Sequence, residues 1–272
     1  MRKAKNNLII LSIPLFRTIK SILFKSVLDT LLANSDIIIY SPFSGNKEFR
    51  DRFERDGLSF VEFTEPKFHL VEKKVLLFTD LCRRHGFLRK NKNFGFEYYN
   101  KNRNLKLPLD NQALEYKLYI KVGLFLASVL GQLKWFWHLL EWFLPMSRHY
   151  DKLLINIADQ YTNITVVQLA NWGIQDRVLA MLSQKKRWRS VLIPYTTDQI
   201  ILNGYFINNF DIICVQGVLE FKFCKDVHGI PGSKIYKLGS SWFRHVDELS
   251  QNLSIYPVKK VILYAGTFNK YF

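Results

Sequence analysis

Cysteine is scarce in this sequence, and no metal-binding pattern is present. Only three of the 272 residues are cysteines, and Cys82, Cys214 and Cys224 form no CxxC pair. Two of them lie inside apolar runs, which favours buried thiols in a reducing compartment over disulfides or metal ligands. The six histidines show no HxxxH or other ligand spacing. We therefore expect no metal site, no bound cofactor and a cytoplasmic location.

The sequence also lacks an apolar run long enough to cross a bilayer. In the most apolar stretch, 119–144, the charge-free part is Val122 to Leu133, about half of the roughly 20 residues that a spanning helix needs. Residues at helical spacing predict an amphipathic helix here instead: Leu114, Leu118, Val122, Phe125 and Val129. The aromatic cluster that follows either packs on the fold or lies at a lipid interface: Trp135, Phe136, Trp137 and Trp142.

No secretory signal is evident at the N-terminus. Pro14 interrupts the apolar run from Leu8 to Phe16, basic residues follow, and no small-residue cleavage site is present. The run is better interpreted as a first strand.

Acidic residues are too few to balance the basic ones, which leaves a formal net charge of +16. Between 83 and 106, eight basic residues face only Glu97: Arg83, Arg84, Arg89, Lys90, Lys92, Lys101, Arg103 and Lys106. A second cluster comprises Lys185, Lys186, Arg187 and Arg189. Both are either solvated or contact anionic lipid or a phosphorylated ligand, so a peripheral position at the inner face of the membrane is an alternative location. No zinc-finger, helix-turn-helix or RNP signature is present, so we expect no nucleic-acid partner.

Strand-like and helix-like segments alternate at both ends of the chain. This alternation predicts an α/β fold with a Rossmann-like, mainly parallel sheet and helices on both faces. No GxGxxG follows the first strand, so a dinucleotide site there is unsupported. The middle, about 66–161, is predicted to be a helical insertion. Strands are predicted at 7–13, 36–42, 58–63, 164–169, 190–195, 211–216 and 234–238, and helices at 17–33, 46–55, 174–184 and 219–228.

Polar or small residues follow several of the predicted strands, where open parallel sheets bind their ligands. Thr197 and Asp198 follow the fifth strand, and Asp198 is the carboxylate best placed to act as a general base, although it also suits a helix cap. Gly239 with Ser240 either cradles a phosphate or forms an ordinary turn. Asp176, near a helix start, suits a charge that complements the helix dipole. Arg17 either binds an anionic group or is an ordinary first-turn residue.

The order of these elements, with its polar turns, resembles the N-terminal half of GT-B-type glycosyltransferases of bacterial surface-polysaccharide synthesis. The resemblance covers about residues 7–267 and rests on Arg17, Gln168-Leu169-Ala170-Asn171 with Asp176, Thr197-Asp198-Gln199 with Asn203-Gly204, and His228-Gly229-Ile230-Pro231 before Lys234-Ile235-Tyr236-Lys237-Leu238-Gly239.

The resemblance implies that 1–257 is an acceptor-side domain and that 258–272 is the first strand of a donor-binding domain. The expected substrates are a nucleotide-sugar donor and a saccharide or lipid-linked acceptor, with no metal. The chain as it stands would then lack most of its donor site and be inactive. The implied catalytic residues are Asp198 and Thr197, and the implied substrate-binding residues are Arg17, Asn171, Asp176, Asn203, Gly239 and Ser240.

Two other function classes share these features. One is a non-catalytic, membrane-associated binding or scaffolding subunit. The other is a polyol-phosphate transferase or sugar epimerase of the same architecture.

Overall fold

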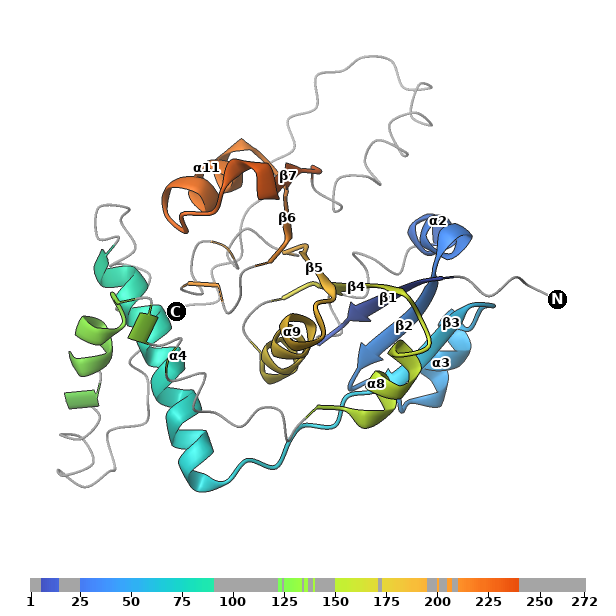
Figure 1. Cartoon of the computed structure of the whole chain (residues 1–272), viewed down its shortest axis with the longest axis horizontal. Coiled ribbons are helices and arrows are strands. Elements are labelled where there is room, and N and C mark those ends of the chain that lie inside the picture. The colour runs from blue at the N-terminus through green and yellow to red at the C-terminus, as the bar shows by residue number, and fades with distance from the viewer. Residues whose placement is uncertain are drawn as a thin grey trace, which may run out of the picture. The chain divides into compact units, whose positions relative to one another are not determined.

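The strands form one parallel sheet with the order β3-β2-β1-β4-β5-β6-β7 (Figure 1). This computed structural model describes residues 6–14, 25–90, 122–123, 125–133, 135–136, 139, 150–170, 173–194, 200, 205–206 and 210–239. The first six strands follow the Rossmann order, which confirms the predicted fold class. The strands are β1 (Asn7–Ser12), β2 (Asp36–Ser41), β3 (Leu58–Glu62), β4 (Asn163–Gln168), β5 (Arg189–Leu192), β6 (Ile212–Val215) and β7 (Ile235–Lys237).

Helices connect the strands, and most boundaries lie within two residues of those predicted. The predicted helix 17–33 is described only from Lys25, because residues 15–24 lie outside the described part. The boundary expected near 257 also lies outside it. The helices are α2 (Lys25–Asn34), α3 (Lys47–Phe53), α4 (Leu70–Lys90), α8 (Lys152–Ala158), α9 (Ile174–Lys186) and α11 (Val218–Asp226), with a 3-10 turn at Gly232–Lys234.

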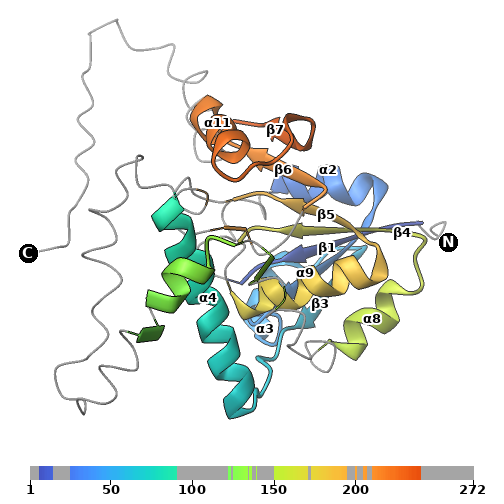
Figure 2. The same cartoon turned by 60° about the vertical axis from the view of Figure 1, so that its left-hand side comes forward.

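Alternate residues of the central strands face opposite layers of helices. Ile10 of β1 belongs to the core that Leu154 of α8 and Leu179 of α9 complete. Leu11 faces the other way, into the core with Leu28 of α2 and Phe49 of α3. Each such fully buried aliphatic side chain contributes about 1.5–3 kcal/mol to folding. The two cores place helices on both faces, with α8 and α9 sharing one of them (Figure 2).

Local hydrogen bonds fix where two of these helices begin. The Asn46 side chain accepts a bond of 3.1 Å from the Phe49 N–H at the start of α3. Asp151 does the same for α8, at 2.9 Å from the Leu153 N–H and 3.1 Å from the Leu154 N–H. Such caps satisfy backbone donors that have no partner inside the helix. Because α8 completes the core beside β1, it is one of the helices that cover the sheet.

Two glycines allow α4 to contact the helical residues 125–130 backbone to backbone. A Cβ added at Gly131 would lie 2.0 Å from the Cys82 carbonyl oxygen, and one at Gly86 would lie 2.0 Å from the Gly131 carbonyl carbon. Ala127, one turn before Gly131, is fully buried. Small residues at this crossing therefore hold the 122–139 segment against α4. Within the described residues, no helix is both long and apolar enough to cross a bilayer.

We predict that Gly131→Ala lowers the free energy of unfolding by about 1–3 kcal/mol, because the new methyl group would overlap two backbone carbonyls. Gly123→Ala is the matched control in the same segment, since a Cβ there meets nothing within 4 Å. It should leave stability unchanged or raise it by up to about 1 kcal/mol, as alanine favours a helix. Urea denaturation measures both variants. Equal effects would show that the two helices do not cross at Gly131.

Candidate functional site

The strand order reverses between β1 and β4, and ligands of open α/β sheets bind beyond the carboxyl ends of strands at such a point. Ser12 ends β1 and pairs in register with Gln168, which ends β4. Gly173 then begins α9, whose first turn carries Gln175 and Asp176. These residues define the candidate site, called the switch-point site below.

The side-chain amide of Gln175 joins three elements at this site. Its Nε2 donates to the Ser12 hydroxyl at 2.9 Å and to the Tyr40 carbonyl at 2.8 Å. The Gln168 Nε2 donates to the Asp176 carbonyl at 2.8 Å. Because each Nε2 group faces a backbone carbonyl, the reversed amide orientation would set two acceptors against each other. The orientation of both amides is therefore fixed.

The oxygen end of each amide has no hydrogen-bond partner among the residues that the structure describes. The Oε1 atoms of Gln168 and Gln175 are buried, and the structure pairs neither with any donor in the described part of the chain. Buried acceptors are costly unless a donor reaches them from the protein, a water or a ligand. The switch-point site thus contains two fixed, buried acceptors whose chemistry suits hydroxyl or N–H donors.

Asp176 makes this site unfavourable for phosphate. Its carboxylate, almost fully buried, accepts a 3.1 Å bond from the Gly173 N–H at the start of α9. A negative charge at a helix N-terminus complements the helix dipole, which is the role that the sequence predicts for Asp176. The same charge opposes a second anion at that end. Direct contact of Asp176 with a substrate stays a prediction.

Tyr40 is a neutral neighbour of the site. Burial, together with the Asp151 carboxylate, raises the pKa of the Tyr40 phenol well above its ordinary value. Its ring packs edge-on against Phe63 with the centroids 5.6 Å apart. The phenol therefore stays protonated at neutral pH and supplies no negative charge here.

Gly239 is the other predicted site residue within the described part. It follows β7 with φ of +79°, the left-handed turn geometry that glycine adopts readily. Three strand spacings separate β7 from β4, about 14 Å at roughly 4.8 Å each. Gly239 is thus on the same edge of the sheet as Gln168 but apart from the switch-point site. The remaining predicted residues lie outside the described part: Arg17, Asn171, Thr197, Asp198, Asn203 and Ser240.

Sequence reasoning missed a buried ion cluster beside the switch-point site. Asp80 of α4 pairs with Arg177 of α9, and its carboxylate lies 3.5 Å from the Arg83 Nη2. Both arginine side chains are almost fully buried, whereas Asp80 is one-third exposed. The Arg83 Nη1 also donates to the Tyr205 carbonyl at 2.8 Å. The cluster holds α4 against the start of α9, where Figure 2 shows the two helices meeting.

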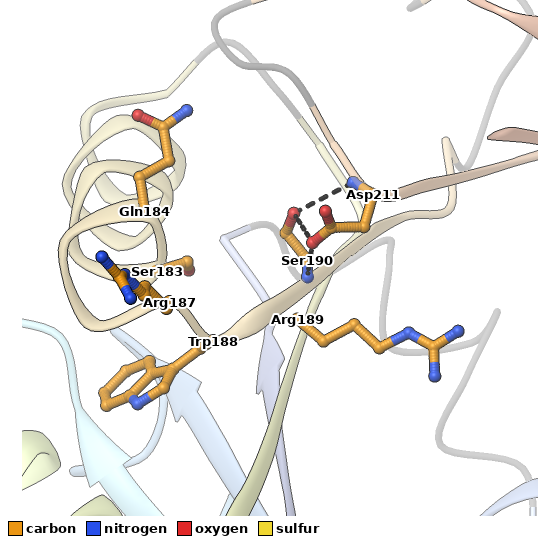
Figure 3. A pocket seen from close by; sticks show the side chains of 7 residues that line it. All are labelled: Ser183, Gln184, Arg187, Trp188, Arg189, Ser190 and Asp211. Atoms are coloured by element: carbon orange, nitrogen blue, oxygen red, sulfur yellow. Dashed lines mark hydrogen bonds between the residues drawn. The ribbon is translucent and has the colours of Figure 1, made fainter.

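Two of the four residues in the second basic cluster are engaged in contacts. Lys186 pairs with Asp159 at 2.9 Å, and the Lys185 ammonium lies 5.4 Å from the centre of the Tyr150 ring. Arg187 and Arg189 line an open pocket of about 580 Å³ near the amino ends of β5 and β6 (Figure 3). Their side chains extend to opposite sides in Figure 3, so they do not converge on one anion.

The pocket that Arg187 and Arg189 line and a second, smaller pocket both lie at the amino edge of the sheet. Ligands are expected at the opposite, carboxyl edge. In the larger one, Asp211 accepts hydrogen bonds from the Ser190 N–H at 2.8 Å and hydroxyl at 2.9 Å, so its carboxylate is already engaged. A second pocket, of about 350 Å³, includes Asp36 and Tyr161 and lies at the amino ends of β2 and β3. We give more weight to the switch-point site, because ligands bind at the carboxyl edge in this fold.

The cysteines are confirmed as free, buried thiols. Burial raises the pKa of Cys82 to about 12, and burial with the Glu220 carboxylate raises the pKa of Cys224 to about 12. Burial also raises the pKa of Cys214. All three thiols are protonated at neutral pH and unsuited to nucleophilic chemistry. No group of three or more metal-ligating side chains occurs among the described residues.

Comparison with protein-family models, with curated proteins and with solved structures found no match. The functional argument therefore rests on the sequence and the geometry above.

We predict that Asp80→Asn lowers the free energy of unfolding by about 2–3 kcal/mol, because two buried guanidinium groups lose their shared carboxylate. Asp159→Asn is the matched control, since it removes a carboxylate from the exposed pair with Lys186. That change should cost about 0–1 kcal/mol. Chemical denaturation compares the two variants, and a cost for Asp80→Asn no larger than the control's would show that the buried cluster is not stabilising.

Proposed function

We propose that this chain is the acceptor-side domain of a glycosyltransferase of surface-polysaccharide or cell-envelope synthesis and that it binds a saccharide at the switch-point site. The observation that carries the proposal is the pair of buried amide oxygens on Gln168 and Gln175. They have no donor within the described part of the chain, and they lie at the edge of the sheet where such folds bind ligands.

A saccharide suits this site better than a nucleotide diphosphate. Sugar hydroxyls are neutral donors, and each would satisfy an acceptor that is otherwise buried without a partner. The Asp176 carboxylate at the start of α9 opposes the phosphates that helix N-termini often bind. A site built to bond hydroxyl groups also discriminates strongly against ligands that lack them.

The chemical step keeps the roles that the sequence predicts. Asp198, with Thr197 beside it, would accept the proton of the acceptor hydroxyl as that oxygen attacks the sugar of a nucleotide-sugar donor. The nucleoside diphosphate leaves with the bonding electrons, and a positive field stabilises it without a metal. Arg17, Asn171 and Asn203 remain candidate substrate ligands.

Saccharide binding tests the proposal directly. We predict that saturation-transfer NMR detects binding of neutral mono- and disaccharides, such as glucose, galactose and N-acetylglucosamine derivatives, to the full chain. Gln168→Met and Gln175→Met should each weaken it about tenfold, the effect of one lost hydrogen bond. Gln184→Met is the matched control, because Gln184 lies on the same helix but at the opposite edge of the sheet. Melting temperatures of all three variants show whether folding is retained.

Two outcomes would contradict the proposal. Binding of UDP, GDP or NAD at the switch-point site, with no saccharide bound, would indicate a nucleotide-binding domain instead. Saccharide binding that folded Gln168 and Gln175 variants retain in full would place the ligand elsewhere.

For the reaction itself, we predict that Asp198→Asn lowers sugar-transfer turnover by about 10²–10⁴-fold in any preparation that is active with nucleotide-sugars, with its melting temperature nearly unchanged. A helix cap would behave differently, costing about 0.5–2 kcal/mol of stability with normal turnover. Release of nucleoside diphosphate and thermal melting, measured on the same protein, separate the two roles.

A further inference from the structure

Residues 122–139 carry an exposed apolar face. Its described members are Val122, Phe125, Leu126, Val129, Leu133, Trp135 and Leu139. Phe125 and Trp135 are the most exposed, at 63% and 62%. The whole segment contains one lysine and no acidic residue. Isolated exposed apolar residues are ordinary on protein surfaces, but a continuous group of this kind marks an interaction site.

The opposite side of the segment is fixed to the fold. Ala127 is fully buried, and Gly131 leaves no space for a side chain against the Cys82 carbonyl of α4. Phe136 packs against the core that contains Phe87 and Phe223. Val122, Leu126 and Val129 recur at the spacing of one helix face, about 160° around the helix axis from Ala127 and Gly131. Val122, Leu126 and Val129 therefore lie on the side turned away from α4.

Charge favours an anionic bilayer as the occupant over a second copy of the chain. Each copy carries +16, so two copies would repel each other. Between positions 84 and 106 the sequence has seven basic residues against Glu97 alone. A run of this kind is attracted to anionic headgroups, and exposed tryptophan and phenylalanine are typical of helices lying in the interface.

We infer that the apolar face of 122–139 inserts into the interfacial region of an anionic membrane, whose headgroups attract a chain with a net charge of +16. The segment lies along the membrane plane rather than across it. This inference does not depend on the proposed saccharide site, because it rests on different residues.

Sedimentation with vesicles tests the inference on the full chain. One vesicle type contains phosphatidylcholine and phosphatidylglycerol in equal parts, and the other contains phosphatidylcholine alone. We expect stronger binding to the anionic vesicles that weakens as salt rises, because salt screens exposed charges. The double variant Phe125→Gln, Trp135→Gln should reduce this binding about tenfold or more, through lost apolar burial in the interface.

The matched control is the double variant Val218→Gln, Leu219→Gln, which changes two equally exposed apolar residues on α11 and should bind like the wild type. All four side chains are exposed, so both variants should keep the wild-type melting temperature. Equal loss of binding in both variants, or salt-independent binding to both vesicle types, would overturn the inference. A dimer detected by light scattering would also overturn the inference if only the Phe125 and Trp135 variant abolished it, because the face would then bind a second copy.

Discussion

Parallel pairing of β1 on both of its edges is the constraint on which the structure depends. Ile10 pairs with Ile38 of β2 and with Val166 of β4, so the three strands share one register. Parallel strands cannot be joined by tight turns, and each connection must cross over through a helix. That requirement produces the helical layers on both faces, and it brings the carboxyl ends of β1 and β4 together at the switch-point site.

A charged cluster joins α4 to α9 at the carboxyl edge of the sheet, beside the switch-point site. Two arginines share the Asp80 carboxylate, and one of them also binds the carbonyl of Tyr205 in the β5–β6 connection. Buried guanidinium groups are tolerated only when they are paired, so the cluster fixes α4 relative to α9. Because α4 also contacts residues 125–130 through Gly86 and Gly131, the switch-point site and the apolar face of 122–139 belong to one connected arrangement.

The sequence predicted the parts of the fold that local patterns encode. Runs such as Ile37-Ile38-Ile39 are β-branched and buried on both sides, and Asn46 is a strong helix cap, so strand positions and the start of α3 followed directly. The carboxyl edge was also the expected place for a site. The burial of the two amide oxygens, which have no donor among the described residues, was not foreseen, because it arises only when the strands and α9 pack together.

Contacts between residues far apart in the sequence explain why the burial of Arg83 was not predicted. Arg83 was grouped with a basic run interpreted as solvated or lipid-contacting, yet it is fully buried. Its partner Tyr205 lies 122 residues away, and Asp80 and Arg177 are 97 residues apart. No local pattern encodes such pairs.

The central claim is that the amide groups of Gln168 and Gln175 form a preorganised site for sugar hydroxyls. Side-chain amide NMR of the full chain tests it most directly. The account predicts that both Nε2 resonances exchange slowly with water in the free protein, because they are buried and bonded, and that both shift on titration with a neutral disaccharide. Resonances that stay in place while the disaccharide binds, or that exchange rapidly before it is added, would contradict the claim.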